Sequence, residues 1–342
     1  MKKTLTAMAL SLGVMAAATG AEAATLDQIK EAGVLKCGVN TSLAGFSAPD
    51  SQGNWSGLDV DYCRAVAAAI FDGDSSKVSF QPLSAQQRFT ALQSGEVDIL
   101  SRNTTWTLSR DTSLGLNFSG VTFYDGQGFM VREDLGVSSA KELDGASICV
   151  QPGTTTELNL ADYFRANGMT FEPVVIEAQS EVVAAYYAGR CDVFTTDASG
   201  LASVRATNPN PAAHVILPEI ISKEPLGPSV RHGDDQFFDI TKWVLFALVE
   251  AEEKGITSAN VDEIAANSSD PGIKRLLGTV EGDGLGSMLG LDEKWAHNAI
   301  KAVGNYGEMF NRNVGPDTAL KLERGLNDLW TRGGLMYASP PR

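Results

Sequence analysis

Two stretches of the chain share the pattern that decides the fold. Residues 88–100 read RFTALQSGEVDIL, and residues 182–194 read VVAAYYAGRCDVF. In each, an apolar helix-like run ends at a glycine, which suits the left-handed conformation past a helix end. A charged residue, an apolar residue, an aspartate and a short apolar run then follow, as in a buried strand. Because this turn from helix to strand occurs once in each half of the chain, the sequence predicts two similar α/β lobes.

The sequence around each stretch alternates between strand-like and helix-like runs. In the first half we expect strand 35–39, helix 60–71, strand 78–80, helix 86–93 and strand 97–100. In the second half we expect strand 146–150, helix 156–167, strand 171–176, helix 180–188 and strand 192–195. This alternation predicts βαβ units around largely parallel sheets.

Two glycine-containing stretches, 126–131 and 225–233, mark where the chain would cross between the lobes. Two crossings make the first lobe discontinuous. We therefore expect residues 24–128 and 231–342 in the first lobe and residues 129–230 in the second. The remaining helix-like runs, at 237–253, 261–266, 294–309 and 319–329, are expected to pack on the first lobe.

The composition excludes several classes of function. Lys and Arg number 27 against 42 Asp and Glu, a net charge of -15, which repels phosphate backbones, so we expect no nucleic-acid partner. The chain has three histidines, which provide few ligands for a histidine-rich metal site. The motifs GxSxG, HExxH and GxxxxGK are absent. We therefore expect no metal, no cofactor and no catalytic residue.

The first residues of the chain form a targeting signal. Lys2 and Lys3 precede an apolar run from residue 5 to about 18, and Ala21-Glu22-Ala23 closes it. This pattern predicts a secretory signal peptide, residues 1–23, cleaved after Ala23. The alternative is an N-terminal helix of the mature fold. The apolar run is shorter than the ~20 residues of a membrane span.

Export changes the interpretation of the four cysteines. In an oxidising compartment they suggest two disulfides, with three possible pairings. We favour Cys37–Cys63 and Cys149–Cys191, because each bridge then stays within one half of the chain. The alternative is four buried free thiols, since cysteine also packs well as a small apolar residue.

Polar residues follow the predicted strands in both halves, where open α/β sheets bind ligands. After strand 97–100, Thr105 offers a hydroxyl and Arg110 a planar fork that matches a carboxylate. Residues 151–157 follow a strand and open a helix, whose free N–H groups suit an anion. Asp197 follows the next strand and can accept hydrogen bonds from an ammonium group. Together these groups fit the α-carbon end of an amino acid.

At these residues the chain resembles the periplasmic solute-binding proteins of polar and general amino-acid ABC importers, and especially the general L-amino-acid binding subgroup. The motifs that carry the resemblance are LKCGVN (35–40), GLDVDYCRA (57–65), RFxAL (88–92) through Arg110, GTTTE (153–157), DVFTTD (192–197) and PLGP (225–228). They cover most of residues 33–240, and the additional C-terminal residues fit the longer subgroup.

The resemblance implies a type II-like fold, in which two α/β lobes joined by two hinge strands close on a ligand. It also implies roles for individual residues. Arg110 and the backbone N–H of Thr155 are expected to hold the α-carboxylate. Asp197, Thr105 and the backbone carbonyl of Asn103 are expected to hold the α-ammonium group.

The expected specificity is broad. Members selective for cationic side chains often have an aspartate and an aromatic residue where this chain has Asn40 and Leu43, although Phe46 is retained as a pocket residue. A permissive pocket is therefore favoured. Arg88 is expected at the side-chain end, where it would favour Glu, Asp, Gln or Asn; the alternative is an arginine on a helix surface.

Two classes of function follow from these residues. The first is an exported periplasmic receptor, expected to be monomeric, that delivers free L-amino acids to an inner-membrane ABC permease with its ATPase. The second is a periplasmic enzyme on the same fold, similar to the related dehydratases, which would need an acid/base pair beside the α-carbon. A sensor without a transport role is a third possibility. We expect the receptor and not the enzyme.

Overall fold

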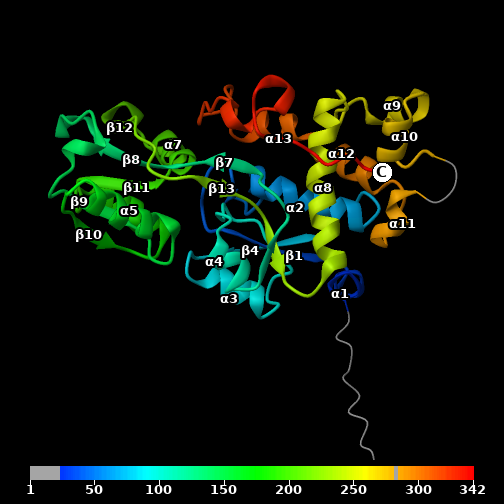
Figure 1. Cartoon of the computed structure of the whole chain (residues 1–342), viewed down its shortest axis with the longest axis horizontal. Helices are drawn as coiled ribbons and strands as arrows, with labels where there is room; N and C mark the ends of the chain where they lie inside the picture. The colour runs from blue at the N-terminus through cyan, green and yellow to red at the C-terminus, as the bar shows by residue number, and fades with distance from the viewer. Residues whose placement is uncertain (1–23, 281–283) are drawn as a thin grey trace, which may run out of the picture.

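The structure is a computed structural model that describes residues 24–280 and 284–342, so the expected signal peptide and its cleavage site lie outside the described residues. Two five-stranded sheets form the centres of two lobes (Figure 1). We call the lobe whose sheet contains residues 35–40 the first lobe and the other the second lobe.

The first lobe has a mixed sheet. Its strands are β1 (Leu35–Asn40), β4 (Val78–Leu83), β5 (Ile99–Leu100), β6 (Leu116–Phe118) and β14 (Ser229–Arg231). Its first helices are α1 (Thr25–Ala32), α2 (Leu58–Ile70), α3 (Gln87–Gln93) and α4 (Leu108–Thr112). A separate short pair of strands comprises β2 (Ala48–Pro49) and β3 (Trp55–Ser56). The strand order is β4–β1–β5–β14–β6, with β1 parallel to β4 and β5 and with β14 antiparallel to β5 and β6. All of β1 except one residue is buried, as expected for a strand covered on both faces.

The second lobe repeats this plan. Its strands are β8 (Gln127–Arg132), β9 (Ser147–Val150), β10 (Glu172–Val175), β11 (Val193–Asp197) and β12 (His214–Ile216). Its helices are α5 (Thr155–Ala166), α6 (Gln179–Tyr187) and α7 (Ala198–Thr207). Its 3₁₀ turns are η1 (Glu133–Leu135), η2 (Ala140–Glu142) and η3 (Pro211–Ala213). The order is β10–β9–β11–β8–β12. β9 is parallel to β10 and β11, while β8 is antiparallel to its neighbours.

Two strands, β7 (Phe123–Asp125) and β13 (Glu224–Leu226), run between the lobes as an antiparallel pair (Figure 1). They are the two hinge strands of the expected fold. Since β8 begins at Gln127 and β14 begins at Ser229, we propose that the lobes meet within β7 and β13. These boundaries lie a few residues before those expected from the sequence.

The rest of the chain adds helices to the first lobe. They are α8 (Asp235–Glu253), α9 (Val261–Asn267), α10 (Pro271–Leu276), α11 (Leu285–Leu289), α12 (Trp295–Val303) and α13 (Tyr306–Asn313), followed by the 3₁₀ turns η4 (Gly325–Asn327) and η5 (Trp330–Arg332). Leu248, Ile300 and Phe310 share one buried cluster with Val39 and Val66 of the first lobe. In Figure 1, α9 to α12 lie on the side of the first lobe away from the second.

Two expected C-terminal helices are corrected by the structure. The run 294–309 forms two helices, because Gly304 takes a positive φ of 79° and the Asn305 side chain starts α13 with a capping box. The helix expected at 319–329 is wrong. Lys321 is left-handed with a φ of 53°, and the side chains that follow bind other elements.

Disulfides join Cys37 to Cys63 and Cys149 to Cys191. This is the pairing favoured above. One bridge ties β1 to α2, and the other ties β9 to the start of the segment that leads into β11. Each bridge therefore lies within one lobe and leaves the lobes free to move relative to each other.

Candidate functional site

A pocket lies between the lobes, beyond the carboxyl ends of strands from both sheets. The first lobe lines it with Asn40, Leu43, Ala85, Arg88, Arg102, Asn103 and Thr105, and the second lobe with Gln151, Thr154, Thr155, Thr156, Gln179, Thr196, Asp197 and Gly200. Most of these side chains carry hydrogen-bonding or charged groups. The pocket is therefore suited to a small polar ligand.

The first-lobe wall is the loop that follows β5. A buried carboxylate, Asp59, holds this loop by accepting hydrogen bonds from the Asn103 N–H at 2.9 Å and the Ser101 hydroxyl at 3.3 Å. Burial raises the pKa of Asp59 to about 6. Asn103 has a positive φ of 36°, a conformation that asparagine tolerates better than most residues. Its side-chain oxygen accepts a 3.0 Å bond from Asn40 at the end of β1.

Arg110 lies just behind this wall. Thr107 caps α4 by accepting a hydrogen bond from the Arg110 N–H. The Arg110 guanidinium donates to the Thr105 carbonyl at 2.8 Å and lies 5.0 Å from the centre of the Phe89 ring. Its other side-chain N–H groups form no hydrogen bond within the described residues. Burial lowers its pKa, while Glu224 and Asp197 raise it.

The second-lobe wall is the start of α5. Thr154 caps the helix by accepting a hydrogen bond from the Glu157 N–H at 3.2 Å, and Gly153 turns the chain with a φ of 71°. The N–H groups of the first turn have no partner within the helix, and they carry the positive end of its dipole. Thr155 and Thr156 of this turn line the pocket. This helix end can bind an anion.

Asp197 ends β11 and faces the same pocket. It is 7% exposed, and burial raises its pKa well above the usual range. The charges of Asp125 and Glu224 raise it further, whereas Arg88 and a hydrogen bond from Asn103 lower it. A cationic group in the pocket would favour the ionised carboxylate of Asp197.

Two arginines line the pocket on the first-lobe side. Arg88 of α3 is 3% exposed and stacks on Phe89 at 4.6 Å, and its Nε has no hydrogen-bond partner among the described residues. Burial lowers its pKa, and so do the charges of Arg102 and Arg110. Arg102 donates to the Leu83 carbonyl at 2.8 Å, and burial lowers its pKa to about 10. A buried, unpaired guanidinium is suited to an anionic or carbonyl group of a ligand.

Sequence reasoning missed the carboxylate of Glu224, which connects the hinge to both lobes. Glu224 is 1% exposed. Its Oε2 accepts hydrogen bonds from the hydroxyls of Thr105 at 2.6 Å and Thr155 at 2.9 Å, and its Oε1 accepts from Asn159 and Ser222. The only sequence signal was a charged residue within a short strand-like run. Arg102 and Gln179 are further lining residues that were not predicted.

The two lobes touch beside the pocket. The Ser84 hydroxyl of the first lobe donates to Glu177 of the second at 2.7 Å. The hydroxyls of Thr105 and Thr155 lie 3.3 Å apart. The structure is therefore a closed arrangement of the lobes.

The expected site residues fall into three groups. Asn103, Thr105, Thr155, Asp197 and Arg88 all line one pocket. Arg110 lies behind that lining, against the carbonyl of Thr105. The expected pocket residue Phe46 lies instead in the core, 1% exposed, with its ring edge-on to Phe123 at 5.2 Å. It shares one buried apolar cluster with Leu43, Leu58 and Phe123.

The described part of the chain contains no group of three or more His, Cys, Asp or Glu side chains that could hold a metal ion. Within residues 24–280 and 284–342, no helix is both long and apolar enough to cross a bilayer.

Comparisons with known proteins agree with this geometry. Residues 35–260 match the family model described as bacterial extracellular solute-binding proteins, family 3. The chain is 61% identical over 343 residues to a general L-amino acid-binding periplasmic protein of Rhizobium johnstonii, and both chains are covered completely. It is 58% identical over 342 residues, again with complete coverage, to a glutamate/glutamine/aspartate/asparagine-binding protein of Rhodobacter capsulatus.

A solved structure gives the same result for the fold. An ABC transporter periplasmic binding protein from Brucella ovis with glutathione bound aligns with a TM-score of 0.92 and 59% identity. The alignment covers 94% of this chain and 100% of that one. These relatives are named as binding proteins and not as enzymes.

Proposed function

Because the chain belongs to family 3 of the bacterial extracellular solute-binding proteins, we propose that it captures free L-amino acids between its lobes and delivers them to an ABC permease with its ATPase. The observation that carries the proposal is the polar pocket, where a helix N-terminus and a buried carboxylate of the second lobe face the hydroxyls and guanidinium groups of the first.

We assign the two charged groups of an amino acid to two sets of residues, each drawn from both lobes. The first turn of α5, through the backbone N–H of Thr155, and the guanidinium of Arg110 bind the α-carboxylate. Asp197, the Thr105 hydroxyl and the Asn103 carbonyl bind the α-ammonium group. For Arg110 the assignment is supported by its nearly complete burial and by the N–H groups that its one side-chain hydrogen bond leaves free.

We assign the distal end of the ligand to Arg88. Its buried guanidinium lines the pocket and has no partner at Nε within the described part of the chain, so a side-chain carboxylate or amide oxygen would satisfy it. Arg102 adds positive charge on the same side, which disfavours cationic side chains. Specificity is therefore broad but favours acidic and amide ligands. Glutathione, bound in the Brucella ovis relative, carries the same free α-amino and α-carboxyl groups on its γ-glutamyl residue.

The family places the protein in the periplasm. We further propose that residues 1–23 direct its export and are removed after Ala23, and that the mature protein acts as a monomer. The acidic net charge of -15 argues against nucleic acid as a partner.

Calorimetry on the protein after removal of bound ligand tests the proposal. We expect tight binding of several amino acids, weak or no binding of their amidated or N-acetylated forms, and unchanged ligand on chromatography after incubation. Tight binding of glutamine α-amide would contradict the carboxylate assignment. Chemical conversion of any ligand would instead support the enzyme alternative.

A further inference from the structure

The C-terminal segment, residues 316–342, contacts one of the two hinge strands. In the pair of β7 and β13, Tyr124 lies opposite Pro225. Pro225 has no N–H, and its carbonyl accepts a hydrogen bond from Trp106 at 2.9 Å on the other side of β13. The N–H and C=O of Tyr124 therefore face the outer edge of β7.

One side chain binds both of these backbone groups. The Oδ1 atom of Asn327 accepts from the Tyr124 N–H at 2.6 Å, and its Nδ2 donates to the Tyr124 carbonyl at 3.1 Å. The amide of Asn327 thus pairs with Tyr124 as the backbone of a third strand would. Asn327 is 4% exposed, so little water competes for these bonds.

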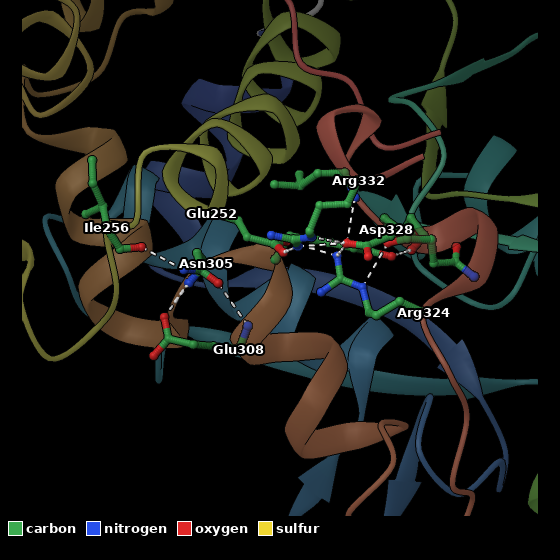
Figure 2. A network of polar contacts seen from close by, with 11 residues as sticks. Glu252, Ile256, Asn305, Glu308, Arg324, Asp328 and Arg332 are labelled. Atoms are coloured by element: carbon green, nitrogen blue, oxygen red, sulfur yellow. Dashed lines mark hydrogen bonds and ion pairs between the residues drawn. The ribbon is translucent and has the colours of Figure 1, made fainter. Parts of the chain in front are cut away.

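Asn327 is itself held by charged side chains of the first lobe. Arg324 Nε donates to the Asn327 carbonyl at 3.0 Å, and its Nη2 donates to Glu252 of α8 at 3.0 Å. Figure 2 shows these polar contacts around Glu252, Arg324, Asp328 and Arg332. The Arg324 guanidinium also lies over two aromatic rings of α13.

A second contact holds the residue before the hinge strand. The hydroxyl of Tyr306 on α13 donates to the Thr122 carbonyl at 2.9 Å. The first-lobe end of β7 is therefore fixed on one side by β13 and on the other by the C-terminal helices and turns.

We propose that Asn327 is a positioning residue of the hinge. It fixes the backbone at Tyr124 to the first lobe, so that the lobes pivot on the second-lobe side of that residue. The inference rests on the proposed function, in which the lobes close on an amino acid. Asn327 and Tyr124 do not line the pocket, so Asn327 acts on binding through the hinge alone.

The expected size of the effect follows from backbone entropy. Without Asn327, Tyr124 gains conformational freedom in the open protein, and this freedom is lost again on each closure. The entropy cost of fixing the backbone of one residue corresponds to a change of about 5- to 30-fold in the equilibrium constant for closure.

The test compares Asn327→Ala with Asn260→Ala. The Asn260 side chain also makes one accepted and one donated backbone hydrogen bond, from the Thr257 N–H at 2.7 Å and to the Gly255 carbonyl at 3.0 Å, and it lies before α9, on the side of the first lobe away from the second (Figure 1). Spin labels at exposed positions 52 and 141, one in each lobe, report the distribution of interlobe distances by double electron–electron resonance. L-Glutamate is the ligand.

For Asn327→Ala we expect a broader distance distribution without ligand and L-glutamate affinity about 5- to 30-fold weaker. Asn260→Ala should lose thermal stability with an unchanged distribution and affinity. If Asn327→Ala does not fold, Asn327→Asp retains the acceptor for the Tyr124 N–H, loses the donor, and should show intermediate broadening.

An unchanged ligand-free distribution in the folded Asn327 variant, or equal broadening in Asn260→Ala, would overturn the assignment. The wild-type protein separates this result from a failure of the proposed function. If L-glutamate does not shorten the wild-type interlobe distance, closure on ligand is wrong. The ligand-free width still tests Asn327.

Discussion

The guanidinium of Arg88 should have opposite effects on the free protein and on the complex, and Arg88→Met tests both. Arg88 is 3% exposed, its Nε lacks a partner among the described residues, and burial together with the charges of two other arginines lowers its pKa. Methionine keeps an apolar stem against Phe89 and removes the charge. Burying a charge without a hydrogen-bond partner costs free energy, and an apolar side chain of similar volume removes that cost. We therefore expect the free energy of unfolding of the ligand-free protein to rise by about 1 kcal/mol.

The same substitution should weaken the binding of acidic ligands. A hydrogen bond to a charged group contributes ~1.5–3 kcal/mol, which corresponds to about 10- to 150-fold in the affinity for L-glutamate. L-Alanine has no distal polar group, so its affinity should change by less than about threefold. Isothermal titration calorimetry gives the affinities, and urea unfolding gives the stability of the ligand-free protein.

Arg231→Met is the matched control. Its guanidinium donates to the carbonyls of Leu92 at 3.0 Å and Val97 at 2.8 Å, outside the pocket between the lobes. This variant should lose stability and keep the affinities for both ligands. If Arg88→Met also loses stability and binds L-glutamate as the wild type does, Arg88 has a structural role and the distal assignment is refuted.

Four further outcomes follow from the site and the cores. Arg110→Ala should weaken the binding of acidic, amide and aliphatic amino acids equally in calorimetry, by ~2–5 kcal/mol or about 30- to several-thousand-fold, because all share the α-carboxylate. A loss of affinity confined to one class of ligand would contradict this role. Because burial raises the pKa of Asp197, its protonated form gains population as the pH falls, so affinity should decrease on acidification, and Asp197→Asn should bind weakly with a flat pH profile. Burial raises the pKa of Asp59 from 3.8 to about 6, so its stabilising contribution is present below about pH 4 and is lost as the pH rises through 6; the difference in unfolding free energy between wild type and Asp59→Asn should show this slope. Removing the Cys149–Cys191 bridge, which joins residues 42 apart, should lower the unfolding free energy by ~2–4 kcal/mol in urea titrations, and an unchanged midpoint would exclude a stabilising role.

The sequence predicted those parts of the fold whose signals are local. The helices and parallel strands on either side of Gly95 and Gly189 were found, because apolar periodicity and a left-handed glycine mark both ends of the turn. The antiparallel strands β6, β12 and β14 were missed. They have only three residues each and gain their hydrogen bonds from strands far away in the chain. The helix expected at 319–329 failed for a related reason, since Arg324 and Asn327 bind distant elements instead.

The site residues could be predicted where polar side chains directly follow the carboxyl end of a strand. Thr105, Thr155 and Asp197 were placed together because the carboxyl ends of parallel strands share one edge of each sheet, and Asn103 was added by the resemblance to the solute-binding proteins. Phe46 was misplaced, because sequence position gives no information about which side of a loop faces the core. The roles of residues such as Arg102 depend on how the two lobes meet, which no local pattern encodes.

Glu224 illustrates how closure and ligand binding depend on the same atoms. Its Oε2 accepts hydrogen bonds from Thr105 of the first lobe and Thr155 of the second, and Glu224 itself lies in a hinge strand. Opening the lobes would separate at least one of these hydroxyls from the carboxylate and admit water in its place. Both threonines also line the pocket, beside the N-terminus of α5. Each hydroxyl donates its single proton to Glu224, so the threonine oxygens present lone pairs to the pocket and can accept from a ligand ammonium group, the group assigned to Thr105. The hinge therefore aligns these acceptors as the lobes come together.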